Sequence, residues 1–419
     1  MERGNYISPY RSKKNSVYFK GERTRHVITH NPASVKPGEI LSVEIPRLEN
    51  ALIVPGTLDL TFDMVLKATL DEDGNALPTF PVNNLAANIV SRYVVKIGSE
   101  IIYDLNYSYI YNTYRDLWLS NECRDNSISR GIQNLNFRRT RTNLTTDMQL
   151  HQEDEVLRNI FKNRYILPLD FELLSDHMPL SSGMHVVFEL TINKKENVLN
   201  YIENNTDADF TMENIRLEYE TIEDELLRRE IDSALTSGSS YLFDHVHHYK
   251  RDIVQKDFDR IFAEIGGIER KSLKGILMIF EDDFPVGRRN SENFPNPGIE
   301  NVNLTIDSLP NKLFSCGYKA ENQWNEICRH FMAEDYKPNQ NTYICLKSYY
   351  NDHFAVWIDL RCTEDNVLHG TGKIQKAANK IMSEMKKRRE SSGRYFMHIF
   401  IVSDARVIIK DNKLFSFDL

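Results

Sequence analysis

The sequence has few cysteines, and no two of them form a motif. Five cysteines occur among 419 residues, and none stands in a C-x-x-C pair. An odd number without such pairs argues against a disulfide framework and against a zinc ribbon. We therefore expect five reduced thiols.

Long apolar runs and a strong excess of one charge are also missing. No stretch approaches the roughly 20 apolar residues that a membrane span needs, and the N-terminal Met-Glu-Arg-Gly-Asn-Tyr lacks the apolar core of a signal peptide. The 52 Lys and Arg residues against 60 Asp and Glu residues give a formal net charge of −8. This balance argues against nucleic-acid binding over the whole surface. We expect no membrane span, and any basic contact surface must be local.

Motifs of catalytic centres are absent or incomplete. The sequence has no nucleophile elbow and no H-E-x-x-H. His245 and His247 would share one face of a strand, as metal ligands can, but no third ligand is identifiable, which favours a polar strand face. The segment 369–373 (His-Gly-Thr-Gly-Lys) lacks the first glycine and the Ser or Thr of a phosphate loop. We predict that the protein is not an enzyme and uses no cofactor and no metal.

Two acidic clusters have equally plain interpretations. The segment 71–75 (Asp-Glu-Asp-Gly-Asn) resembles a calcium loop, but Val82 stands where that loop needs a bidentate glutamate. An acidic hairpin turn accounts for it better. Glu281, Asp282 and Asp283 could be read as catalytic carboxylates, yet three adjacent acids at a strand end are typical of a solvated turn.

Basic residues gather at the N-terminal end of the chain. The segment 1–36 has no apolar periodicity, so we expect an arm there and not a core element. Such an arm can neutralise phosphates or acidic neighbours without a fold of its own, the alternative being a plain disordered tail. The predicted inter-subunit or inner-surface contacts are Arg11, Lys13, Lys14, Lys20, Arg23 and Arg25.

Short β-like segments fill two parts of the chain, 37–222 and 241–419. In the first part, apolar residues at 58, 60, 62, 64 and 66 alternate over five steps, which predicts a strand with one face on a core. Between the two parts, Leu227, Ile231 and Leu235 recur every four residues, as in a short amphipathic helix. We expect a helical linker at 223–240 and place the domain boundary there.

The two parts repeat one order of elements. A strand pair precedes an aromatic-rich helical segment at 109–118, and another strand pair precedes a helix at 321–331. After each helix we expect two strands, the first at 165–171 and at 343–350, the second carrying Phe188 and Trp357. A further amphipathic helix is predicted over 373–390. Some eight strands in about 180 residues predict an all-β fold, with two tandem eight-stranded jelly-roll β-sandwiches and a few short helices.

Short strings in both parts carry a resemblance to a known family. They are Ala-Val-Trp-Ile-Asp-Leu-Arg at 355–361, Leu-His-Gly-Thr-Gly at 368–372 and the closing segment 402–417, with 44–48, 55–58 and 164–170 similar in style. The chain resembles the double jelly-roll major capsid proteins of the adenovirus and tectivirus lineage. The hexon-like proteins of Maverick/Polinton elements and adintoviruses are the nearest match.

The resemblance implies a mechanical function. Three copies would form a trimer with a pseudo-hexagonal outline, and these capsomers would tile an icosahedral shell around a DNA genome. The implied partners are further copies of the chain, penton-type single jelly-roll and minor capsid proteins, and packaged DNA through non-specific contact. The implied location is the virion, with assembly in the nucleus of the host cell. The alternative is a non-viral tandem β-sandwich that serves as a binding or attachment module.

Overall fold

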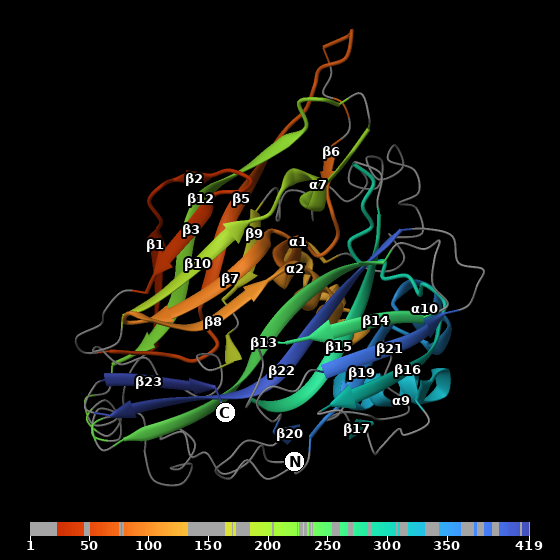
Figure 1. The fold of residues 1–419 in the computed structure, drawn as a ribbon. Helices are drawn as coiled ribbons and strands as arrows, with labels where there is room; N and C mark the ends of the chain where they lie inside the picture. The colour runs from red at the N-terminus through yellow and green to blue at the C-terminus, as the bar shows by residue number, and fades with distance from the viewer. Residues whose placement is uncertain are drawn as a thin grey trace.

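The structure is a computed structural model, which Figure 1 shows as a ribbon. Isolated positions between 224 and 237 and the short segments 309–310 and 373–374 are also described. Apart from these, the structure describes residues 23–45, 51–74, 77, 79–132, 164–169, 171–172, 185–202, 205–223, 238–253, 260–266, 271–283, 287–306, 317–331, 343–361, 381–387, 394–410 and 413–418.

Strands up to Ile222 form two sheets. Sheet 1 has the order β1 (Arg23–Thr29), β12 (Asp209–Ile222), β5 (Asp59–Lys67), β9 (Arg164–Pro168), with β2 (Ser34–Val35) and β4 (Leu52–Ile53) also paired to β12. Sheet 2 has the order β3 (Ile40–Glu44), β10 (Val186–Ile192), β7 (Val90–Ile97), β8 (Glu100–Asn106). A small ladder joins β6 (Thr79–Pro81) and β11 (Leu199–Tyr201).

Strands from Ser239 onward form two more sheets. Sheet 3 has the order β13 (Ser239–Ile253), β22 (Tyr395–Lys410), β15 (Ser272–Asp282), β19 (Ala355–Asp359), with β20 (Lys373–Ile374) on β15 and β23 (Lys413–Asp418) on β22. Sheet 4 has the order β14 (Arg260–Ile265), β21 (Ile381–Lys387), β16 (Ile299–Ile306), β17 (Leu309–Pro310), with β18 (Tyr318–Lys319) on β16.

Both halves have the connectivity of a jelly roll. If the eight main strands of each half are numbered in chain order, sheets 1 and 3 both read 1-8-3-6 and sheets 2 and 4 both read 2-7-4-5. All pairings between these strands are antiparallel. Two four-stranded antiparallel sheets joined in this order are a jelly roll. The prediction of an all-β fold with two tandem jelly rolls is therefore confirmed.

Short helices lie mainly in the connections between strands. They are α1 (Leu85–Asn88), α2 (Ser108–Asp116), α3 (Asn121–Asp125), a 3-10 turn at Ile128–Arg130, α7 (Lys195–Val198), α9 (Ala320–Phe331) and α10 (Leu346–Asp352). The helices predicted at 109–118 and 321–331 are α2 and α9. Among the described residues, no helix is both long and apolar enough to cross a membrane.

The two halves bury their strands differently. Along β12, buried residues such as Phe210 and Met212 alternate with more exposed ones, so one face of sheet 1 is open. In β15, five consecutive residues from Ile276 to Phe280 are all buried, and β22 is buried without interruption from Met397 to Ala405. Continuous apolar runs mark strands that are covered on both faces. Sheet 3 is therefore covered on its outward face too.

Three local predictions are wrong. Part of the predicted helix 373–390 is strand, because β20 and β21 pair in sheets 3 and 4. The predicted strand 343–350 is largely the helix α10. Losing that strand shifts the count by one, so Trp357 lies on the sixth strand of its half and Phe188 on the seventh. The two residues do not correspond.

The predicted arm is partly wrong as well. Residues 23–29 form β1, which pairs with β12 over its whole length, from Arg23 opposite Ile222 to Thr29 opposite Arg216. Its residues are exposed except for His26, which is half-buried. An exposed edge strand carries little apolar periodicity, which explains why the sequence pattern suggested an arm.

Close packing within sheet 3 generates a test of the fold. A Cβ atom added to Gly275 would lie 2.2 Å from an indole carbon of Trp357, and that indole is stacked on His330 with 3.5 Å between ring centroids. We expect Gly275→Ala to destabilise the protein by about 1–3 kcal/mol because the buried ring cannot move freely. Urea denaturation measures the loss. The double variant Gly275→Ala with Trp357→Phe should be more stable than the sum of its single changes predicts, since phenylalanine leaves that space open.

Candidate functional site: the seam between the two jelly rolls

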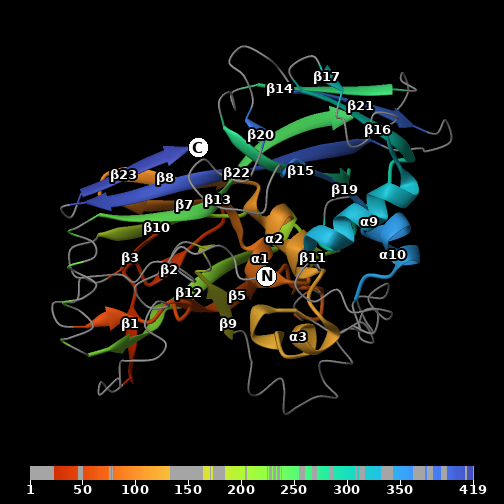
Figure 2. The ribbon, with the colours of Figure 1, turned by 90° about the horizontal axis from the view of Figure 1, so that it is seen from below.

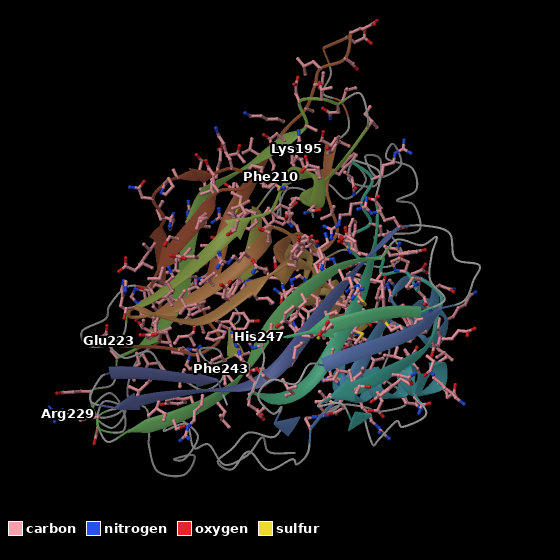
Figure 3. All side chains as sticks on the ribbon, in the orientation of Figure 1. Lys195, Phe210, Glu223, Arg229, Phe243 and His247 are labelled. Carbon is pink, nitrogen blue, oxygen red and sulfur yellow. The ribbon has the colours of Figure 1, made fainter. Side chains whose placement is uncertain are left out.

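The two jelly rolls meet along an interface that we call the seam. The first jelly roll contributes α2 and its flanking residues, and the second contributes sheet 3, α9 and α10. Figure 2 shows α2 and α9 side by side. In Figure 3, Phe243 and His247 mark β13, which runs along β8 of the first half.

Aromatic rings from both halves fill one end of the seam. The ring of Trp118, just after α2, is stacked on Phe331 of α9 at 5.4 Å and lies 6.1 Å from Trp324. Tyr114 of α2 packs edge-on against Phe294 and Phe331, and its hydroxyl donates to the carbonyl oxygen of His353 over 3.1 Å. Burial strongly raises the pKa of Tyr114, so this hydroxyl stays a donor. The apolar contacts stabilise the docking of the two halves.

A buried ion pair crosses the seam beside these rings. Arg124 of α3 donates to Glu292 over 2.9 Å, and the two side chains are only 3% and 1% exposed. The second guanidinium nitrogen of Arg124 donates to the carbonyl oxygen of Asp116. The Asp116 carboxylate also accepts from Asn84 and Arg130. Burial raises the pKa of Glu292 despite the nearby Arg124.

A second row of buried, hydrogen-bonded polar side chains crosses the seam near the start of α2. Nε2 of His248 and Nδ1 of His398 lie 3.0 Å apart, and Nε2 of His398 lies 3.2 Å from a carboxylate oxygen of Glu281. Arg289 donates to the other Glu281 oxygen over 3.2 Å. The same guanidinium reaches the first jelly roll, where it donates to the carbonyl oxygen of Asn197 over 2.7 Å and to Asn88 over 3.3 Å.

The aromatic residues at the start of α2 cover this row of buried polar groups. Tyr107 has a φ of 55°, a left-handed conformation that is uncommon for a residue other than glycine. Its ring lies 4.7 Å from the His248 ring and 5.0 Å from the His398 ring. Tyr109 lies under the Arg289 guanidinium. The first jelly roll therefore closes over charged groups that belong to the second.

The six basic residues predicted as contacts are only partly described. Arg11, Lys13, Lys14 and Lys20 lie outside the described residues. Arg23 and Arg25 lie on β1 and form ion pairs with Glu220 and Glu218 of the same chain. None of the six lies at the seam as far as the structure describes them.

The histidine strand and the acidic clusters also have defined surroundings. Within the described part of the chain, no group of three His, Cys, Asp or Glu side chains could hold a metal ion. His247 instead contacts the Lys271 ammonium at 3.0 Å and the Ser403 hydroxyl at 3.3 Å. Asp71 accepts from the backbone N–H of Asp73, as a turn requires. Residues 369–372 lie outside the described residues.

The prediction of a solvated turn at Glu281, Asp282 and Asp283 is wrong for Glu281. Its neighbours Asp282 and Asp283 are half-buried and exposed, but Glu281 is buried and takes part in the seam. Burial favours a higher pKa for Glu281, yet the hydrogen bond from His398 and the charge of Arg289 outweigh it and lower the pKa. A signal was available, because Glu281 directly follows the apolar run 276–280, and His398 interrupts another apolar run. Arg124, Arg289 and Glu292 carried no such signal.

Comparisons with known proteins were made by sequence and by structure. Neither a scan of protein-family models nor a search of curated protein sequences gives a match. Solved structures do match over nearly the whole chain. The PBCV-1 VP54 structure fitted into a reconstruction of the virophage Sputnik has a TM-score of 0.60 at 10% identity, covering 96% of this chain and 98% of that one.

Two further structures agree. The structure of the Sputnik virophage itself gives a TM-score of 0.62 at 9% identity, covering 97% of this chain and 90% of that one. The mavirus major capsid protein gives 0.54 at 9% identity, covering 94% and 90%. The chain has the double jelly-roll fold. The order of strands in sheets 1 to 4 and the likeness to these structures lead to that conclusion independently.

The Arg124–Glu292 pair allows a direct test of the seam. We expect Arg124→Met to destabilise the protein by about 3–5 kcal/mol, because it leaves the Glu292 carboxylate buried without its cation. Urea denaturation measures the change. The matched control is Arg229→Met, which breaks an exposed pair with Glu225 at the edge of the molecule (Figure 3) and should cost less than about 1 kcal/mol. Similar losses in both variants would contradict the role given to the pair.

Proposed function

We propose that the protein is a viral major capsid protein. Three copies form a pseudo-hexameric capsomer, and these capsomers tile an icosahedral shell around a DNA genome. The observation that supports this most is that two sandwiches of one topology are held together by a buried seam within one chain. Three such chains present six similar sandwiches, which suits a hexagonal outline.

The function proposed is mechanical and not catalytic. Sandwiches joined by a rigid seam keep their loops and sheet edges in fixed positions, as lateral contacts between subunits require. The net charge of −8 keeps unassembled subunits soluble. The proposed partners are further copies of the chain, penton-type single jelly-roll proteins and minor capsid proteins. The proposed location is the virion, after assembly in the host nucleus.

The proposal extends to lineage and to the division of the chain. The residue strings at 355–361 and 402–417 favour the Maverick/Polinton and adintovirus capsid proteins. We place the division between the jelly rolls at 223–240, a range that begins directly after the last strand of sheet 1 and includes the first two residues of β13 in sheet 3. The segment before β1 is proposed to face the inner side of the shell and to contact neighbouring subunits, minor proteins or packaged DNA.

The oligomeric state tests the proposal. Native mass spectrometry of the purified protein should give three times the chain mass of 48.9 kDa, and electron microscopy should show a hexagonal outline. A stable monomer at micromolar concentration would contradict the capsid function. It would favour the alternative, a tandem β-sandwich that serves as an attachment module.

The basic N-terminal residues allow a second test. Neutral replacements of Arg11, Lys13, Lys14 and Lys20 should leave the fold and the trimer intact and should lower the yield of shells. The loss should vary with salt, because exposed charge contacts weaken as the screening length shortens. Sedimentation at low and high ionic strength measures trimers and shells.

The matched control replaces Arg23 and Arg25. Both already pair with glutamates of β12, so their loss should act on β1 more than on assembly. Unchanged shell yield for the four-residue variant at both ionic strengths would show that the segment before β1 is only a tail.

A further inference from the structure

The His248–His398 pair can hold only a limited number of protons while the seam is closed. A carboxylate only accepts hydrogen bonds, so His398 must present its Nε2 hydrogen to Glu281. Neutral His398 then accepts through Nδ1, and His248 donates its Nε2 hydrogen across the 3.0 Å contact. Both tautomers are therefore determined by Glu281.

Adding protons to this arrangement soon breaks it. One proton on His398 can be tolerated if His248 changes tautomer and accepts. A second proton places N–H groups on both facing nitrogens, which removes the hydrogen bond and brings two positive rings together. The closed seam thus binds at most one proton at this pair, whereas two histidines in water bind two in acid.

The charged groups around the pair add to this restriction. Lys250 on β13 lies over the Tyr107 and Phe396 rings, close to both histidines. Arg289, from the connection after β15, supplies a second positive charge beside Glu281, which is the only carboxylate hydrogen-bonded to the pair among the described residues. From the start of α2, the uncharged rings of Tyr107, which precedes the helix, and Tyr109 face the cluster.

These surroundings lower the pKa of both imidazoles. Burial, His398 and Lys250 together lower the pKa of His248 to about 3. Burial lowers the pKa of His398 as well, although Glu281 opposes it. Both groups are neutral in the closed state at pH 7. The stability that depends on their neutral form is complete above the ordinary histidine pKa of about 6.5 and falls as the pH drops below it.

We propose that the buried His248–His398 pair makes the seam acid-sensitive, so that protonation separates the start of α2 from sheet 3 and releases Arg289 from the first jelly roll. The two jelly rolls then loosen relative to each other while each keeps its own sheets. This inference depends on the contacts within one chain and stands whether or not the protein forms a shell.

The tryptophans report on this opening. The sequence has three, and Trp118 of the first half packs against Trp324 of the second, while Trp357 lies in sheet 3 under His330. Tryptophan fluorescence of the full-length protein is followed from pH 7.5 to 5, with circular dichroism as the measure of intact sheets. We expect a fluorescence change below about pH 6.5 without loss of strand signal. The equilibrium constant for opening should increase about tenfold for each unit by which the pH falls, per excess proton that the open state binds.

Two variants distinguish this pair from other titrating groups. His398→Gln and His248→Phe remove one titrating ring each, and glutamine can still donate to Glu281. Either variant should flatten the pH dependence, whereas the control His30→Gln, in the first jelly roll away from the seam, should follow the wild type. Hydrogen exchange of α2 in the wild type at pH 7 and pH 5.5 is a second measurement that needs no variant. Equal fluorescence changes in wild type and variants, or unchanged exchange of α2, would overturn the proposal.

Discussion

The outward face of sheet 3 is too apolar to be exposed to water. Much of the molecule is arranged around that constraint. The central strands β15 and β22 of this sheet are buried on both sides and largely apolar, with residues 276–280 fully buried. Exposing such a surface costs roughly 25 cal/mol for every Å² of apolar area. The first jelly roll and α9 supply the cover. Docking of the first jelly roll therefore stabilises the second.

The cover combines apolar rings with buried charged groups, which gives the docking both strength and position. Rings such as Trp118 and Phe331 contribute buried area without strict geometry. Arg124 and Arg289 are different, because each has a partner or a carbonyl oxygen in both halves. A displacement of one half by a few ångströms would leave buried charges without partners, at a cost of several kcal/mol. The buried ions thus restrict how the sheets can slide.

How much the sequence predicts depends on the range of the contacts involved. Alternation in β5 is a local pattern, and the strand predicted from it is correct. The prediction of a helix over 373–390 failed because Ile381 and Met385, four residues apart, fit a helical stripe, while pairing with β16 and β14 is a long-range effect. The prediction of a strand at 343–350 failed because tyrosines favour strands, whereas the hydroxyl of Ser348 caps the start of α10.

The seam shows the same limit at the level of single residues. Glu281 and His398 stand out in the sequence because each follows or interrupts an apolar run. No local sequence pattern marks Arg124 or Glu292, because the two residues are each other's partner and lie 168 positions apart. A charged residue becomes a buried one only when a distant segment covers it, and the order of elements in one half does not reveal that segment.

The two jelly rolls also differ in a way that fixes their roles within the chain. The open face of sheet 1 carries a ladder in which Glu218 accepts from Arg25 and Thr61, and Arg164 reaches Asp63. These surface pairs are only partly exposed, and pairs of this kind add little stability. Sheet 3 instead combines continuous apolar runs with a few buried or partly buried polar clusters, such as Glu281–Arg289–His398 and Lys274–Asp244. One topology therefore serves two purposes. The charged face of sheet 1 can remain in contact with water, and the apolar face of sheet 3 requires its partner within the same chain.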